Sequence, residues 1–246
     1  MPLRSSLFRC RTRTNYFSFF FIFMPATDAK SKKMNDSEKT QKLKNYYKTV
    51  LPSATEAGMQ FALSLATPHT IRKKDFYLRE GTVCNHVAFV CTGLVRMYHL
   101  VDGKEKIMGF CNEMNYISDY RSFLTRTPSQ IFIQALEDTE VLETSWDNLQ
   151  LLYNTVPEAN TMGRLIAEKL FNDLYESAVI GVKLSYEQRY ELLLATCPWV
   201  SQRIPQYMIA SYLGITPEGF SRIKARSARA KPQPARQEHV LIEVKK

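Results

Sequence analysis

The sequence is poor in the residues that build disulfide frameworks and metal cages. Its 246 residues include only five cysteines, and no two of them form a Cys-x-x-Cys pair. An odd number of scattered cysteines is unlike the even, regular pattern of a disulfide-stabilised secreted domain, and it favours reduced thiols. The five are Cys10, Cys84, Cys91, Cys111 and Cys197.

Histidine is also scarce, and its spacing argues against an enzyme. A cupin-type metal site needs a His-x-His pair, and the four histidines, His69, His86, His99 and His239, form none. Haem ligation by one of the first three has no further support in the pattern. A Gly-rich phosphate loop and a Gly-x-Ser-x-Gly elbow are missing as well. We therefore predict no catalytic residue, no metal and no cofactor.

A long apolar run is missing too. The longest, residues 16–24 (YFSFFFIFM), follows four arginines and imitates a secretory signal. It is too short to cross a bilayer, which needs about 20 apolar residues. Because the later features are typical of the cytoplasm, we favour translation from Met24 or Met34. Residues 1–33 are then a leader or a wrongly assigned start, and we expect a cytoplasmic protein without membrane contact.

Charge is concentrated at the two ends of the chain. The net charge is +9, from 33 basic and 24 acidic residues. Residues 1–33 hold seven basic and one acidic residue, and residues 201–246 hold nine and three, so each end carries +6. The remaining 17 basic and 20 acidic residues give residues 34–200 a charge of −3. A basic end on an acidic body indicates a polyanionic partner contacted locally.

Between these ends, the pattern of apolar residues changes twice, from helical to strand-like and back to helical. Residues 35–66 have apolar side chains at helical spacing, and Pro68 is expected to close this segment. Thr70 to Ser145 reads as short strands at intervals of about ten residues, which predicts an antiparallel sandwich or barrel. Asp102-Gly103 is expected to form a hairpin turn. With 45% apolar residues, such a chain can bury a large core.

A long helix is predicted to begin at Pro157. Ser185 and Gln188 then have the spacing of a capping box, which starts another helix. An apolar stripe along the long helix suits either a dimer seam or packing against its own sheet, and we favour the seam. The stripe consists of Met162, Leu165, Ile166, Leu170 and Leu174, continued by Ala178 and Gly181.

The most informative segment is residues 204–226, IPQYMIASYLGITPEGFSRIKAR. Its spacing predicts one helix up to Leu213, a turn at Gly214, and a second helix capped by Thr216 with Pro217 at its first position. Small and apolar residues fall where two such helices would touch. This is the pattern of a helix-turn-helix, whose second helix enters the DNA major groove.

Polar residues of the second helix are candidates for DNA contact. Glu218, Ser221 and Arg222 share one face, where Arg can bond guanine and Glu can accept from cytosine. Backbone contacts are expected from Thr216, Lys224, Arg226 and Arg229. Gly219 is unfavourable inside a helix by about 1 kcal/mol. It leaves open an alternative, a ligand-sensing module with impaired DNA binding.

From about Lys42 to Arg226 the sequence resembles the Crp/Fnr family of bacterial transcription regulators. Three pieces carry the resemblance: Ile204-Pro205-Gln206, Ile209 to Glu218, and Ser221-Arg222-Ile223. The resemblance implies an α+β fold with an antiparallel, cyclic-nucleotide-binding-like β-roll over residues 35–150. A dimerisation helix over 157–184 and a winged-helix domain over 185–246 would follow. The implied protein is a cytoplasmic homodimer that binds double-stranded DNA.

The implied effector pocket is degenerate. Family members that bind cAMP carry Gly-Glu and Arg-Ser at positions matching Ser118-Asp119 and Ser129-Gln130 here, so the cation for the phosphate is gone. Arg121 and Arg126 lie near in sequence but suit exposed loop positions. We therefore expect no response to cAMP, and an effector that is unknown or absent.

The resemblance fades after Arg226. Cys10 stands alone, so the iron–sulfur chemistry of the family's oxygen sensors is not supported. Residues 227–236 (SARAKPQPAR) have a disordered composition. Residues 239–245 (HVLIEVK) suit a short wing strand or a frayed tail.

Overall fold

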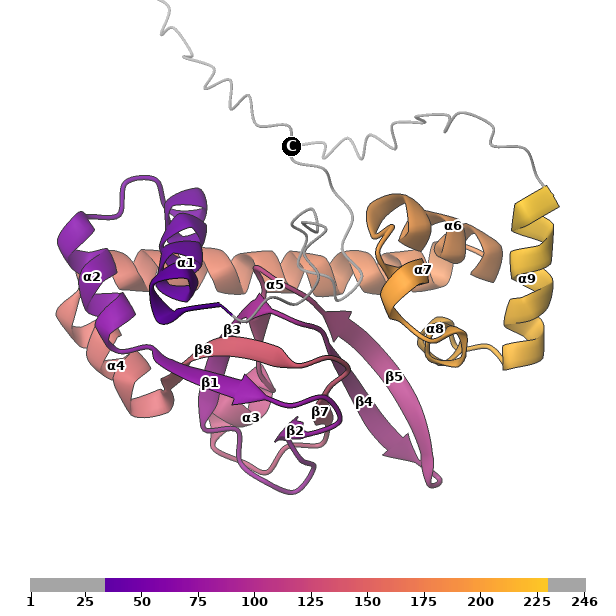
Figure 1. The fold of residues 1–246 in the computed structure, drawn as a ribbon, viewed down its shortest axis with the longest axis horizontal. Helices are drawn as coiled ribbons and strands as arrows, with labels where there is room; N and C mark the ends of the chain where they lie inside the picture. The colour runs from indigo at the N-terminus through magenta and orange to yellow at the C-terminus, as the bar shows by residue number, and fades with distance from the viewer. Residues whose placement is uncertain (1–33, 230–246) are drawn as a thin grey trace, which may run out of the picture.

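The computed structural model describes residues 34–229 of the chain (Figure 1). Two helices precede a region of strands, and six helices follow it. The elements are α1 (Asp36–Val50), α2 (Glu56–Ser64), β1 (Thr67–Ile71), β2 (Phe76–Leu78), β3 (His86–Thr92), β4 (Val95–Val101), β5 (Lys104–Cys111), β6 (Tyr116–Ile117), α3 (Tyr120–Thr125), β7 (Phe132–Ala135), β8 (Thr139–Ser145), α4 (Trp146–Thr155), α5 (Pro157–Lys183), α6 (Tyr186–Thr196), α7 (Val200–Arg203), α8 (Gln206–Leu213) and α9 (Pro217–Arg229).

The strands form two four-stranded sheets packed into a roll. Their orders are β1-β8-β3-β6 and β2-β7-β4-β5, and every pair is antiparallel. Side chains that alternate inward fill the space between the sheets, and Val90, Ile133 and Val141 are fully buried there. The predicted antiparallel sandwich is thus confirmed.

The predicted boundary at Pro68 is wrong. Pro68 lies inside β1, opposite Leu142 of β8, and the preceding helix already ends at Ser64. β1 is an edge strand, so a residue without an N–H can be accommodated on its unpaired side. The sequence cue was misleading because proline breaks helices and central strands alike but not edge strands.

The hairpin predicted at Asp102-Gly103 is confirmed. It joins β4 to β5, and Val101 pairs with Lys104 across it. Both turn residues have left-handed backbone angles, with φ of 52° and 70°. A two-residue turn of this kind matches the twist of the strands it connects.

Helix α5 runs along much of the length of the molecule, behind the roll (Figure 1). It has 27 residues and begins at Pro157, as predicted. The capping box that begins α6 is also confirmed, since the Ser185 and Gln188 side chains each accept from the other's backbone N–H. Within residues 34–229, no helix combines the length and apolarity needed to cross a membrane.

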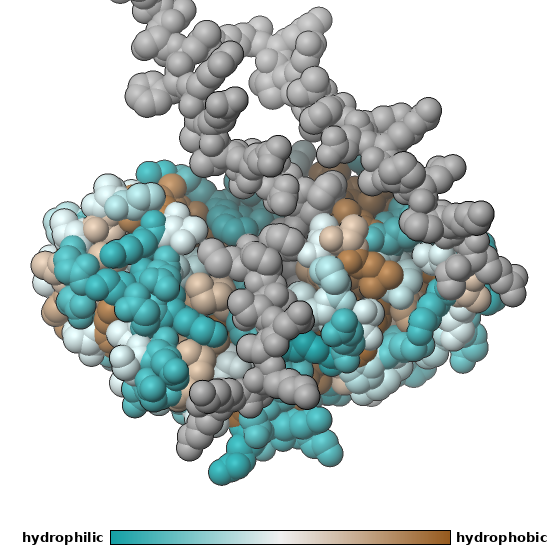
Figure 2. Space-filling model, turned by 45° about the horizontal axis from the view of Figure 1, so that its top comes forward, coloured by the Kyte–Doolittle hydropathy of each residue, from teal (hydrophilic) through white to brown (hydrophobic). Residues whose placement is uncertain are grey.

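The C-terminal helices share a hydrophobic core with the roll. Leu94, Tyr98, Ile107 and Phe110 of the roll are buried in the same cluster as side chains of α6, α8 and α9. The Ser211 hydroxyl of α8 accepts from the Ile107 N–H (3.1 Å) on the open edge of β5. In Figure 2, hydrophilic residues cover most of the left end, whereas hydrophobic residues reach the surface mainly in the right half.

Two predicted features lie outside the described residues. These are the leader, residues 1–33, with Cys10, and the wing strand at residues 239–245. The other four cysteines are free thiols and buried.

Candidate functional site

Helices α8 and α9 form the predicted two-helix motif, joined by a tight turn. Gly214 ends α8 with a left-handed backbone (φ 77°), which glycine adopts without steric cost. The Ile215 N–H then reaches back to the Ala210 carbonyl (3.0 Å), which closes the helix end. Thr216 accepts from the Gly219 N–H (3.1 Å) and so caps α9, as predicted.

Buried side chains fix the angle between the two helices. Phe220 and Ile223 of α9 pack into the cluster that also contains Ile209 of α8. Phe220 meets Tyr190 of α6 edge to face, with ring centroids 5.0 Å apart. Ala210 is fully buried, so it has the small side chain that a close approach of helices requires.

The opposite face of α9 is exposed and carries the predicted base-reading residues. All three are exposed: Glu218, Ser221 and Arg222. Helix α9 itself lies at one end of the molecule (Figure 1). The Ser221 hydroxyl donates to the Pro217 carbonyl (3.0 Å) within the helix. The pKa of Glu218 lies below its usual value, because backbone and Thr216 hydrogen bonds and the nearby charge of Arg222 favour the carboxylate.

The cations predicted to contact the DNA backbone differ in whether they form ion pairs within the protein. Within the described residues, neither Arg222 nor Lys224 forms an ion pair, and both are exposed. Arg226 instead pairs with Glu187 at the start of α6. Helix α9 ends at Arg229, whose side chain lies outside the described part of the structure. Thr216 is exposed beside the helix N-terminus, where a DNA phosphate is favoured.

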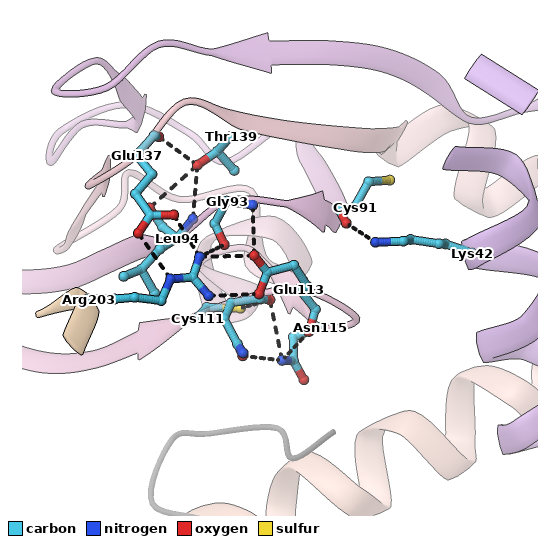
Figure 3. A network of polar contacts seen from close by, with 11 residues as sticks. Lys42, Cys91, Gly93, Leu94, Cys111, Glu113, Asn115, Glu137, Thr139 and Arg203 are labelled. Carbon is cyan, nitrogen blue, oxygen red and sulfur yellow. Dashed lines mark hydrogen bonds and ion pairs between the residues drawn. The ribbon is translucent and has the colours of Figure 1, made fainter. Parts of the chain in front are cut away.

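Arg203 of α7 connects these helices to the roll (Figure 3). Its guanidinium donates to Glu113 (2.9 and 3.0 Å), to Glu137 (2.7 and 3.0 Å) and to the Gly93 carbonyl (3.1 Å). Burial alone would lower the pKa of Arg203, but the hydrogen bonds and charges of the two carboxylates raise it above its usual value. Sequence reasoning missed this contact, because its partners are 66 to 110 positions away.

Gly93 allows this network to form. Its backbone has a φ of 110°, and an added Cβ would lie 2.4 Å from the Thr139 hydroxyl. Only glycine therefore fits, and its N–H donates to Glu113 (3.1 Å) while its carbonyl accepts from Arg203. Gly93, Glu113 and Glu137 each lie in a turn between two consecutive strands. These three turns, which hold Arg203, lie at one end of the roll.

The predicted effector-pocket residues come together, but the polar groups of Asp119 and Ser129 already bond other parts of the protein. Asp119 caps α3 by accepting from the Ser122 N–H (3.1 Å), and its other oxygen accepts from the Ser129 hydroxyl (2.8 Å). Ser118, Asp119, Arg121 and Gln130 line a cavity, whereas Ser129 is buried and is not part of its wall. Arg121 is exposed.

Arg126, considered as a substitute cation, has a different role. Its guanidinium donates to the Cys84 carbonyl (3.0 Å) and to the Asn85 side chain, and it lies 5.5 Å from the Trp146 ring centroid. These contacts hold the guanidinium against the roll. It is not among the residues that line the cavity.

The cavity lies between the roll and α5 and has a volume of about 700 Å³. Four of the five residues predicted to form a dimer seam face it: Met162, Ile166, Leu170 and Leu174. Leu165 is half-buried. A second set on α5 is more exposed, namely Phe171 (68%), Tyr175 (60%) and Val182 (88%), and does not line the cavity. Helix α5 therefore has an inner and an outer apolar face, which the stripe alone did not separate.

The roll matches a known domain family. Residues 68–155 match the family model described as the cyclic nucleotide-binding domain. No curated protein sequence matched the chain.

Solved structures extend this likeness beyond the roll. FixK2 from Bradyrhizobium japonicum is 21% identical with a TM-score of 0.54, covering 67% of this chain and 85% of its own. The c-di-GMP-responsive regulator CLP from Xanthomonas campestris is 17% identical with a TM-score of 0.55, covering 71% and 92%. A CooA mutant from Carboxydothermus hydrogenoformans is 22% identical with a TM-score of 0.53, covering 73% and 83%. The resemblance to Crp/Fnr regulators is thus confirmed at the level of the fold.

Proposed function

We propose that this protein is a sequence-specific, DNA-binding transcription regulator of the Crp/Fnr type, with α9 as its reading helix. The observation that carries the proposal is the exposed face of α9. Among the described residues, Arg222 and Lys224 are exposed there and form no ion pair, and the other face of the helix is packed into the core. The shared fold with FixK2 and CLP supports it.

Two copies would pair so that each presents one α9 to half of a palindromic site. The outer apolar face of α5, formed by Phe171, Tyr175 and Val182, is the surface we assign to pairing. Exposed apolar residues aligned on one helix are typical of such an interface. The half-sites would then be centred about 34 Å apart, which is one turn of DNA.

Footprinting upstream of the protein's own gene, across a salt series, tests this function. We expect a discrete protected palindrome, which Arg222→Ala weakens by about 1–3 kcal/mol, because a bidentate base contact is lost. Arg72→Ala is the matched control, since Arg72 is an exposed arginine on the roll, and it should leave protection unchanged. Diffuse binding by the unaltered chain, or equal effects of the two variants, would contradict the assignment.

We also propose that cAMP is not the effector. Asp119 occupies the position of the expected glutamate but is bonded to Ser122 and Ser129. The buried wall of the cavity offers no permanent cation among the described residues, because Arg121 is exposed. An unpaired phosphate there would carry a large desolvation penalty. Calorimetry should detect no binding at micromolar cAMP, and a saturable heat would refute this part.

The alternative, a sensing module with impaired DNA binding, rested on Gly219 and on the unusual C-terminal tail, which lies outside the described residues. The structure gives that glycine an unbroken helix from Pro217 to Arg229. Its position therefore provides no argument for a damaged reading helix. Salt-labile, diffuse protection in the footprint is the result that would favour the alternative.

A further inference from the structure

We propose that the cavity between the roll and α5 binds an uncharged, largely apolar small molecule. The inference rests on the proposed function, for which it would be the sensing site. A volume of about 700 Å³ lies within the roughly 300–1,000 Å³ that is usual for pockets for small ligands.

The wall is mainly apolar and adaptable. Met97 lines it from β4 and Ile131 from the residue before β7. Met108 of β5 is half-buried beside them, and Leu152 and Met162 come from α4 and α5. Thioether side chains are flexible and polarizable, so they can fit ligands of irregular shape, including aromatic ones. Such a wall gives binding energy by burial rather than by hydrogen bonding.

Several polar groups at the wall already have partners within the protein. Asp119 is bonded through both oxygens, as described above. His99 is bonded to the Gln130 carbonyl (2.8 Å), and Asp173 accepts from Lys169 (2.8 Å). A ligand that bonded these three side chains would have to displace the partners they already have.

The charge of the wall disfavours an anion. Three carboxylates line the cavity, those of Asp119, Glu158 and Asp173. Among the described lining residues, Arg121 is the one permanent cation, and its side chain is exposed. The half-buried Tyr47 and Tyr116 are 3.4 Å apart at their hydroxyls, and removal from water raises the pKa of both, so they stay neutral.

A second copy of the chain is a poorer occupant than a small molecule. The outer face of α5, with Phe171, Tyr175 and Val182, is the exposed apolar surface that a partner helix can cover. Met162 and Ile166 point to the other side, into the space closed by the strands and by α4. Pairing through the outer face leaves that space free.

A pair of fluorescent probes tests the inference on the full chain. N-phenyl-1-naphthylamine is uncharged, and 8-anilinonaphthalene-1-sulfonate has nearly the same shape with a negative charge. We expect saturable binding of one uncharged probe per chain, and binding of the anionic probe weaker by roughly tenfold or more. Equal affinity for the two, or no saturable binding of the uncharged probe, would overturn the proposal.

Filling the cavity should abolish this binding. Ala167→Phe adds a ring from the inner face of α5, and Met108→Trp adds one from β5. Ala195→Phe is the matched control, because Ala195 is exposed on α6, away from the cavity. With circular dichroism showing folded chains, either filling variant should weaken the uncharged probe at least roughly tenfold. Unchanged binding in both would refute the location.

Measuring probe binding at increasing protein concentration tests whether a partner's helix occupies the cavity instead of a small molecule. If a partner's helix filled the cavity, uncharged-probe binding would fall as the chain pairs, which would also refute the proposal. The assay contains no DNA, so a negative result leaves the footprinting test of the proposed function unaffected. A failed footprint with normal probe binding would instead leave a ligand-binding protein without the assigned reading helix.

Discussion

At the scale of single residues, the cations of α9 are not equivalent, although the sequence shows them in one basic cluster. Lys224 is unpaired within the described residues, whereas Arg226 is held by Glu187. We expect Lys224→Ala to reduce the slope of log affinity against log salt by about 1, because one phosphate contact is lost. Arg226→Ala should change the slope less. Filter binding measures both, and the reverse order would contradict this.

Gly219 offers a second test at this scale. An added Cβ would lie 3.4 Å from the Thr216 hydroxyl and 3.9 Å from the Ile215 Cβ, so alanine fits. We expect Gly219→Ala to raise the free energy of unfolding by up to about 1 kcal/mol in urea titrations. Gly214→Ala is the control with the opposite expectation. It should lower the free energy of unfolding, because the left-handed backbone of Gly214 is unfavourable for alanine. Destabilisation by Gly219→Ala would show an unrecognised constraint on α9.

At the scale of elements, the surface assigned to pairing of two chains is the outer apolar face of α5. Phe171→Glu would place a charge in the middle of the exposed outer face. We expect it to convert a dimer to a monomer in sedimentation experiments, since a buried unpaired charge is strongly disfavoured. Leu151→Glu on α4, where Leu151 is also exposed, is the control and should leave the dimer intact. A dimer that survives Phe171→Glu would move the seam to another face.

The contribution of the contact between α7 and the roll can be measured as a loss of unfolding free energy. Arg203→Met leaves the Glu113 carboxylate, whose side chain is 8% exposed, without its partner. We expect a loss of about 3–5 kcal/mol of unfolding free energy, as for other broken buried pairs. Arg164→Met removes an exposed pair with Glu168 on α5 and should cost about 0.5 kcal/mol or less. Similar losses would mean that the Arg203 network contributes little.

These elements also show what the sequence can predict. Local signals placed the start of α5 at Pro157, the capping box at Ser185 and the turn at Gly214, because each depends on a few neighbouring residues. The partners of Arg203 are far away in the chain and leave no local signal. The stripe on α5 was ambiguous for a similar reason: periodicity shows that residues share a face, but not which surface that face meets.

At the scale of the whole molecule, buried thiols couple stability to alkaline pH. Burial raises the pKa of Cys91 to about 12 and that of Cys197 to about 11. Unfolded thiols lose their protons near pH 8.5, so the unfolded chain binds fewer protons than the folded chain above that pH. We expect full stability below about pH 8.5 and a falling urea midpoint between about pH 9 and 11.

The double variant Cys91→Ala/Cys197→Ala provides the control for this pH dependence. It should be less stable near neutral pH, because both side chains are buried, yet lose less as the pH rises. The same slope in both chains would assign the alkaline loss to other groups, such as the buried tyrosines.

The shared core of the roll and the C-terminal helices has a consequence for dissection of the chain. Leu94, Tyr98, Ile107 and Phe110 are covered by α6, α8 and α9 rather than by the roll alone. A fragment truncated after α5 would keep its strands but present these side chains to water. We expect it to self-associate, which light scattering would show. The roll and the C-terminal helices are therefore not two domains joined by a flexible linker. Any change in their relative position must rearrange the side chains packed between them.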